Sequence, residues 1–144
     1  MRLTVVSVTV KDQEKAKAFY RDILGFSVEA ENPMGDGNTW IRMNPSKGRA
    51  GITLVTWLDK LKPGGQQGLV LETGKIEKAH AKLKAKGLKI SSISKASWGS
   101  FATFADPDGN GWVLAEMAAT PLKPHKYKMP MGASMAKRRV VKKV

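Results

Sequence analysis

The sequence predicts a single α+β domain made of two βαβββ modules, and three observations lead to this fold class. A chain of 144 residues with 42% hydrophobic residues has the length and apolar content of one domain. The order of strand-like and helix-like segments restarts after a loop rich in Lys, Pro and Gly at residues 60–65. The motif EKAKA at residues 14–18 also returns as EKAHA at residues 77–81. We place the domain at residues 1–119, with module one at about 3–58 and module two at about 66–118.

The first module begins with a strand and a helix. Valines alternate along residues 5–10, which is typical of a strand with one buried face. Asp12 suits a helix N-cap, apolar side chains then recur at helical spacing as far as Ile23, and Gly25 can end the helix in a left-handed conformation. Three strand-like runs follow, at about 26–31, 38–44 and 50–58.

The second module repeats this order. Leu69 and Leu71 begin an alternating strand, and Ile76 opens a helical stripe that ends at Gly87. His80 lies in this helix, where we expect a partly buried packing residue and not a metal ligand. Further strands are expected near 88–94, 98–105 and 111–117.

Positive charge is concentrated at the end of the chain. The protein carries 25 Lys and Arg against 12 Asp and Glu, a net charge of +13. Eight of these cations and no acid lie in residues 121–144, so the rest of the chain has a net charge of only +5. We predict a basic, flexible tail at 120–144 that could contact nucleic acid or an anionic surface without base specificity. A solubilising extension, or an arm that docks on a partner subunit, is the alternative.

Several classes of protein are excluded by what the sequence lacks. It has no cysteine, which excludes disulfide bonds, thiolate metal ligands and thiol nucleophiles. It contains no G-x-S-x-G, G-x-G-x-x-G or phosphate-binding loop motif. No apolar run is long enough for a transmembrane segment or a signal peptide, so a cytoplasmic protein is expected.

Two motifs together carry a family resemblance. The segment FYRDILGF spans residues 19–26, and DPDGN spans residues 106–110. With the repeated modules, they resemble the glyoxalase/bleomycin resistance protein/extradiol dioxygenase superfamily, also called the vicinal oxygen chelate proteins, over about residues 3–118. The resemblance implies paired half-barrels around a cavity that holds a metal, a drug or a substrate, and a homodimer. Both motifs read physically as structural, one as a core-facing helix end and one as a tight turn.

The same resemblance implies where metal ligands would lie. Metal-using members place His or Glu side chains at positions that correspond here to Val5, Gly68 and Val113, and a fourth on the strand near 50–58. None of the three named residues can ligate a metal through its side chain, and residues 44–58 contain no His, Asp, Glu or Cys. We therefore predict no metal and no other cofactor, and we lean towards a protein that is not an enzyme.

Strand alternation then predicts the lining of the cavity. If Val5 and Val113 point inward, the inward face is mostly apolar with hydroxyl groups and one carboxylate, which suits a small organic ligand. Tryptophans on or beside the strands could stack on a planar ligand, although such residues also serve as core or dimer interface. The predicted ligand-binding residues are Ser7, Thr9, Trp40, Trp57, Glu72, Trp98 and Met117.

Glu72 is the single weak candidate for a catalytic residue, because burial in an apolar site would raise the pKa of a carboxyl group and let it act as a base. The alternative is that Glu72 reaches solvent or pairs with a Lys or Arg. The leading hypothesis is a metal-independent small-molecule-binding protein, including the drug-sequestering resistance type. One alternative is a glyoxalase-type lyase, isomerase or dioxygenase with a non-standard site. Another is a nucleic-acid-associated protein that acts through the tail.

Overall fold

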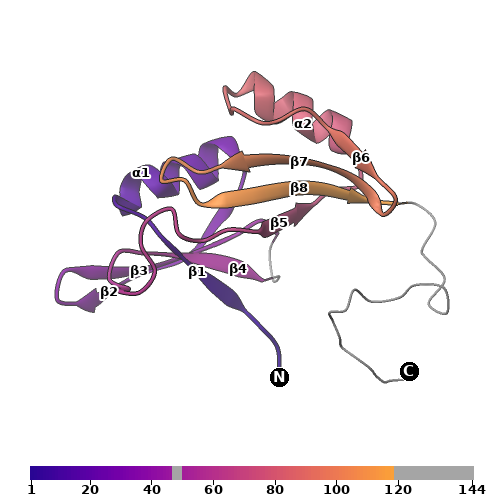
Figure 1. Ribbon diagram of the computed structural model, residues 1–144. Coiled ribbons are helices and arrows are strands. Elements are labelled where there is room, and N and C mark those ends of the chain that lie inside the picture. Colours follow the sequence, from indigo (N-terminus) through magenta and orange to yellow (C-terminus); the bar gives the residue numbers. More distant parts are fainter. Residues whose placement is uncertain (47–49, 119–144) are drawn as a thin grey trace.

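The computed structural model describes residues 1–46 and 50–118, and it contains both predicted modules (Figure 1). Module one consists of β1 (Val5–Thr9), α1 (Gln13–Ala18), a π-helical turn η1 (Phe19–Ile23), β2 (Ser27–Gly35), β3 (Asn38–Asn44) and β4 (Gly51–Val55). Module two consists of β5 (Leu69–Glu72), α2 (Ile76–Ala85), β6 (Ser94–Ala96), β7 (Gly99–Ala105) and β8 (Gly111–Met117). The α+β fold class with two βαβββ modules is confirmed.

Each module forms one four-stranded mixed sheet. The strand orders are β1-β4-β3-β2 and β5-β8-β7-β6, so the first and last strands of each module lie side by side. These two strands are parallel, while the other neighbours pair antiparallel. A parallel pair needs a long crossover, which the helix and the intervening strands supply. The two sheets, neither of which closes into a barrel, are the paired half-barrels of the predicted fold; α2 lies over β7 and β8 in Figure 1.

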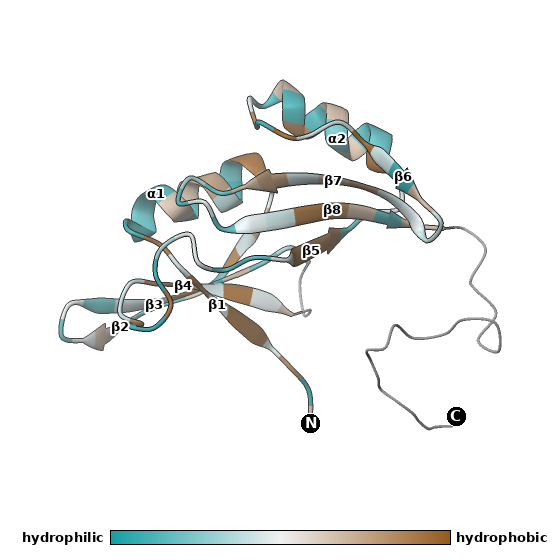
Figure 2. Cartoon of the chain, viewed as in Figure 1, coloured by the Kyte–Doolittle hydropathy of each residue, from teal (hydrophilic) through white to brown (hydrophobic). Residues whose placement is uncertain are grey.

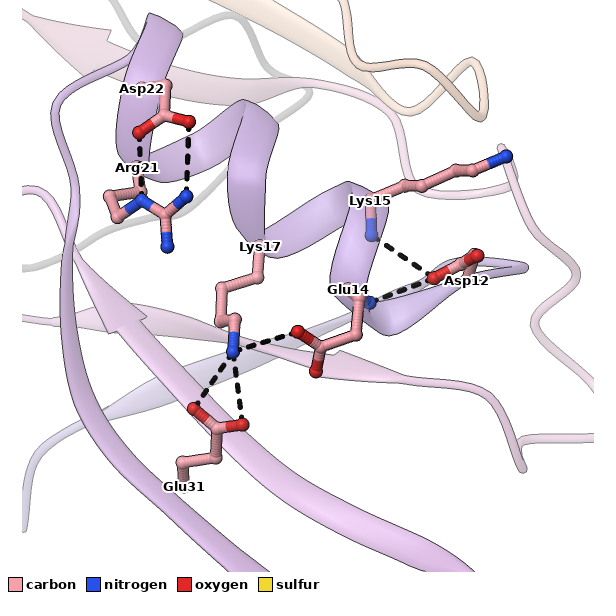
Figure 3. Close-up of polar contacts among 7 residues, drawn as sticks. All are labelled: Asp12, Glu14, Lys15, Lys17, Arg21, Asp22 and Glu31. Atoms are coloured by element: carbon pink, nitrogen blue, oxygen red, sulfur yellow. Dashed lines mark hydrogen bonds and ion pairs between the residues drawn. The ribbon is translucent and has the colours of Figure 1, made fainter.

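The ends of the helices follow the local sequence. Asp12 caps α1, and its Oδ1 accepts hydrogen bonds from the backbone N–H groups of Glu14 (2.9 Å) and Lys15 (3.1 Å), as Figure 3 shows. The chain leaves the two helices through Gly25 (φ +79°) and Gly87 (φ +91°), both in the left-handed region, which the sequence predicts for Gly25.

One lysine ties α1 to the first sheet. Lys17 Nζ lies 3.1 Å from a carboxylate oxygen of Glu14 and 3.1 Å from both carboxylate oxygens of Glu31 on β2 (Figure 3). The hydrogen bond to Glu14, helped by Glu31, raises the pKa of Lys17. Since the pairing is at the protein surface, it orients β2 and α1 more than it stabilises them.

The core runs through both modules. Val8 and Val10 are 0% and 1% exposed and belong to the core cluster, although Thr9 between them is also only 2% exposed. Tyr20 and Phe26 from module one pack on Trp112 from module two, with ring centroids 5.8 Å apart in each pair. Figure 2 shows the apolar character of β1 and β5 in brown against the mostly hydrophilic α2. A single hydrophobic cluster therefore fixes the two modules against each other.

The strand predicted at 88–94 is wrong. Leu88 turns into the core, Ile90 makes only an isolated bridge to Phe104, and the strand itself is limited to β6. Ser91 replaces part of the ladder with its side chain, because Ser91 Oγ accepts from the Thr103 N–H (2.9 Å). A side chain that competes for backbone groups in this way interrupts regular pairing.

Other boundaries differ from the sequence prediction by a few residues. β4 ends at Val55, which leaves Trp57 in the following connection, and β2 extends as far as Gly35. His80 is half-buried in α2, where Nε2 lies 2.8 Å from the carbonyl oxygen of Ser91, in keeping with a packing role. No helix within the described residues is long and apolar enough to cross a membrane. The predicted tail at 120–144 lies outside the described residues.

Candidate functional site

A buried hydrogen-bond network joins the two motifs that carry the family resemblance. Tyr20 Oη donates to Asp106 Oδ2 (2.7 Å) and accepts from Trp112 Nε1 (3.0 Å). Asn110 Nδ2 donates to the same Asp106 oxygen (2.8 Å) and to the Thr9 carbonyl oxygen on β1 (3.0 Å). Burial raises the pKa of Tyr20, and the charge of Asp106 raises it further, so the phenol stays protonated. The motifs thus hold β1 against β8.

The linker between the modules covers the free edge of β1. Gln66 Nε2 donates to the Ser7 carbonyl oxygen (2.9 Å), and the Gln66 N–H donates to Asn110 Oδ1 (3.1 Å). Because an edge strand otherwise exposes unpaired backbone groups, these contacts protect β1 and fix its position relative to the second module.

The side of the first sheet that faces away from the core is called here the module-one face. Since Val8 lies in the core, its neighbours on β1, Ser7 and Thr9, lie on this other face. Ser7 pairs with Thr53 on β4, and Thr53 pairs with Arg42 on β3, so the three residues form one row across the sheet. The Ser7 and Thr53 hydroxyl oxygens are 3.4 Å apart.

Strand pairing identifies the fourth metal-ligand position that the sequence left uncertain. Val5 pairs with Gly51 in module one, and the register of Leu69 with Trp112 puts Gly68 level with Gly111 in module two. Val113 lies two residues after Gly111, so its counterpart in module one lies two residues after Gly51.

That residue is Thr53, so the implied ligand positions are Val5, Thr53, Gly68 and Val113. Gly68 has a φ of +80°, a conformation in which a side chain such as His would be strained. No group of three or more His, Cys, Asp or Glu side chains suited to a metal ion occurs within residues 1–46 and 50–118.

Arg42 is a site residue that sequence reasoning missed. Its guanidinium Nε donates to Asn44 Oδ1 (3.0 Å). The Asn44 side chain lies over Gly51, where an added Cβ would overlap Asn44 Oδ1. The predicted site included hydroxyl groups, tryptophans and one carboxylate but no cation. The signal for Arg42 in the sequence is its position two residues after Trp40, on the same face of the strand.

The side of the second sheet that faces away from the core, the module-two face, is mainly apolar. Val70 is 55% exposed and pairs with Val113, while Met117 is 45% exposed at the end of β8. Glu72, the carboxylate of this face, is exposed. Trp98 lies between β6 and β7 and stacks on Phe101, with ring centroids 5.6 Å apart and an interplanar angle of 20°.

The predicted ligand-binding residues divide among three places. Ser7, Thr9 and Trp40 share the module-one face, Glu72 and Met117 belong to the second sheet, and Trp57 and Trp98 lie in connections. Thr9 is only 2% exposed, and its Oγ1 has no hydrogen-bond partner among the described residues.

Described residues form three pockets, and the two smaller ones include residues of the two faces. The largest, about 440 Å³, is at the start of α2, where Glu116 Oε1 accepts from the Ile76 N–H (2.7 Å). An apolar pocket of about 140 Å³ lies between the sheets beside Phe26. The third, about 220 Å³, is lined mainly by apolar residues such as Phe26 and Leu83, together with Glu72, Lys82 and Lys86. Glu72 is the one predicted ligand-binding residue that reaches these pockets.

Comparisons with known proteins agree with this fold. Residues 2–114 match the Glyoxalase/Bleomycin resistance protein/Dioxygenase superfamily. The chain is 34% identical to YetH of Bacillus subtilis (strain 168) over 119 residues, covering 80% of this chain and 98% of YetH. It is 33% identical to human mitochondrial methylmalonyl-CoA epimerase over 130 residues, covering 81% and 72% of the two chains.

Among solved structures, the chain resembles TnmS3, an antibiotic binding protein from Streptomyces sp. CB03234. The two are 34% identical with a TM-score of 0.77, and the match covers 82% of this chain and 97% of TnmS3. The architecture, the paired motifs and these matches together show that this chain belongs to the glyoxalase/bleomycin resistance protein/dioxygenase superfamily.

Proposed function

We propose that this protein binds a small organic molecule on the faces of its two sheets without using a metal ion. The observation that carries the proposal is the identity of the four implied ligand positions, Val5, Thr53, Gly68 and Val113. Two valines and a glycine offer no donor atom in their side chains, and a neutral threonine hydroxyl alone is a poor ligand for a divalent ion.

The chemistry of the two faces suits an organic ligand. The module-two face offers aliphatic surface at Val70 and Met117, and burial of apolar area supplies most of the binding energy of small organic molecules. Half-buried Trp40 on the module-one face gives a flat surface on which a planar group can stack. The half-buried Ser7 hydroxyl, 3.4 Å from the buried Thr53 hydroxyl, can orient such a ligand through a hydrogen bond.

The relation to TnmS3 supports one form of this function. TnmS3 is an antibiotic binding protein, and it is 34% identical to this chain. A protein that sequesters a drug needs affinity and no chemistry, which agrees with an apolar face that lacks a metal-ligand set. We therefore favour a drug-sequestering role over a catalytic one.

An epimerase-type enzyme is the second candidate. The observation that favours it is the 33% identity with human methylmalonyl-CoA epimerase. Glu72 on β5, which lines the mainly apolar pocket of about 220 Å³ but has an exposed side chain, would be the candidate base in such an enzyme. The homodimer implied by the family resemblance stays a prediction, which the mass of the protein in solution tests.

Native mass spectrometry of the full-length protein, combined with elemental analysis, tests the proposal. The expected result is an organic molecule retained at up to one copy per chain, or taken up from a panel of planar antibiotics, with no stoichiometric transition metal. One equivalent of Fe, Mn, Co, Ni or Zn per chain would contradict it. Turnover of methylmalonyl-CoA by this protein, abolished by Glu72→Gln, would favour the second candidate instead.

A further inference from the structure

Arg42 places a positive charge in the row where relatives that use a metal place a ligand. Arg42 pairs across the sheet with Thr53, the fourth implied ligand position. Its neighbours on β3, Ile41 and Met43, are 1% and 0% exposed in the core, so alternation puts Arg42 on the module-one face.

Asn44 fixes the Nε atom of the Arg42 side chain. Arg42 Nε donates to Asn44 Oδ1 (3.0 Å), and that oxygen lies directly over Gly51 on β4. Gly51 is in turn the pairing partner of Val5 on β1. Arg42 Nε is therefore held 3.0 Å from an oxygen atom that lies over β4.

A guanidinium group in this place changes which ligands the face prefers. Arginine keeps its charge throughout the physiological pH range, and its planar fork of N–H donors matches the oxygens of an anionic group. Half-burial of Arg42 strengthens its electrostatic effect relative to a fully exposed cation. The same charge repels a divalent cation and attracts an oxyanion.

We infer that Arg42 takes the electrostatic place of the metal ion and recognises an anionic oxygen group, such as a carboxylate, phenolate or sulfonate, on a planar organic ligand. This inference rests on the proposed function and names the class of ligand. Trp40 lies two residues before Arg42 on the same face, about 7 Å along the strand. A ring that stacks on Trp40 thus brings a substituent at its edge towards the guanidinium.

Two fluorescent probes that differ in charge test this inference. The anionic probe is 8-anilinonaphthalene-1-sulfonate, and the neutral probe is N-phenyl-1-naphthylamine, which has the same aromatic body without the sulfonate. Full-length protein at moderate salt is titrated with each. The wild type is expected to bind the anionic probe at least about 10-fold more tightly, as one charge-assisted hydrogen-bonded contact allows.

Variants of Arg42 test whether this side chain recognises the anionic probe or whether the net positive charge of the chain attracts the probe. Arg42→Gln is expected to remove most of the preference for the anionic probe and to change the affinity for the neutral probe by less than about 3-fold. Arg42→Lys is expected to keep part of the preference. Arg21→Gln is the matched control, because it removes one exposed arginine that pairs with Asp22.

The outcomes are distinguishable. The role of Arg42 is overturned if Arg42→Gln leaves the preference for the anionic probe unchanged, or if Arg21→Gln reduces it equally. Either result leaves the proposed function in place. Absence of saturable 1:1 binding of either probe to the wild type overturns the proposed function as well. Circular dichroism checks that each variant is folded, and Arg42→Lys decides the question if Arg42→Gln does not fold.

Discussion

Tyr20 Oη donates a 2.7 Å hydrogen bond to Asp106 Oδ2, which joins two residues that are 86 positions apart in the sequence. Tyr20 belongs to the helix-end motif of module one, and Asp106 opens the DPDGN turn of module two. Asn110 donates to the same carboxylate and also to the backbone of β1. The network thereby sets the position of β1, and with it the module-one face, relative to the second sheet.

Replacing Tyr20 by Phe is expected to lower the free energy of unfolding by about 1–3 kcal/mol, because Trp112 Nε1 loses its acceptor and a buried Asp106 oxygen loses a donor. Urea denaturation measures the change. A double-mutant cycle with Asp106→Asn isolates the contact, and additive effects of the two substitutions would contradict a direct coupling.

The pH dependence of stability provides an independent check on the same hydroxyl group. Burial raises the pKa of Tyr20 above the value of about 10 of an unfolded tyrosine. Above that pH the unfolded chain releases a proton that the folded protein keeps, so stability falls as the pH rises. Between about pH 9.5 and 11, the free energy of unfolding is expected to fall more steeply with pH in the wild type than in Tyr20→Phe. The difference in slope corresponds to on the order of one proton. Parallel profiles would show that Tyr20 does not contribute.

The cap of α1 gives a prediction about local stability. Asp12→Ala removes the acceptor for two backbone N–H groups at the start of the helix and is expected to cost about 0.5–2 kcal/mol in urea denaturation. Asp59→Ala changes an exposed residue outside the regular elements and serves as the control. Equal effects of the two substitutions would contradict a capping role.

Gly51 is required by the arrangement that holds Arg42. In Gly51→Ala, the new methyl group overlaps Asn44 Oδ1 and approaches the Met43 carbonyl oxygen, a change expected to destabilise the protein by about 1–3 kcal/mol. Displacement of Asn44 also weakens binding of the anionic probe. Gly74→Ala, at a glycine with open space around it, is the matched control and should change neither property.

Trp40 and Arg42 are expected to act on different parts of a ligand. Trp40→Leu removes the flat surface and should weaken binding of the anionic and neutral probes by a similar factor of about 3–10. The preference for the anionic probe should persist, since Arg42 remains. Loss of the preference in Trp40→Leu would show that the tryptophan and not the arginine discriminates between the probes.

The local features of the fold could be predicted from the sequence. The Asp12 cap, the left-handed residue Gly25 and the alternation that buries Val8 each depend on a few neighbouring residues. The strand expected at 88–94 failed for a non-local reason, because Ser91 bonds with its side chain to Thr103 on another strand.

The candidate site was less predictable for the same reason. Register between strands is set by pairing over long sequence distances, so the sequence alone did not identify Thr53 as the fourth ligand position or place Arg42 beside it. The contact of Tyr20 with Asp106 was likewise invisible, although both motifs were recognised.

Titration of chelator-treated full-length protein with the anionic probe, in the absence and presence of Mn²⁺, Co²⁺ or Zn²⁺, tests the central claim most directly. Saturable binding of one probe per chain is expected, with the same affinity in the absence and presence of each metal ion. Binding that appears only after a metal ion is added would contradict metal-independent recognition.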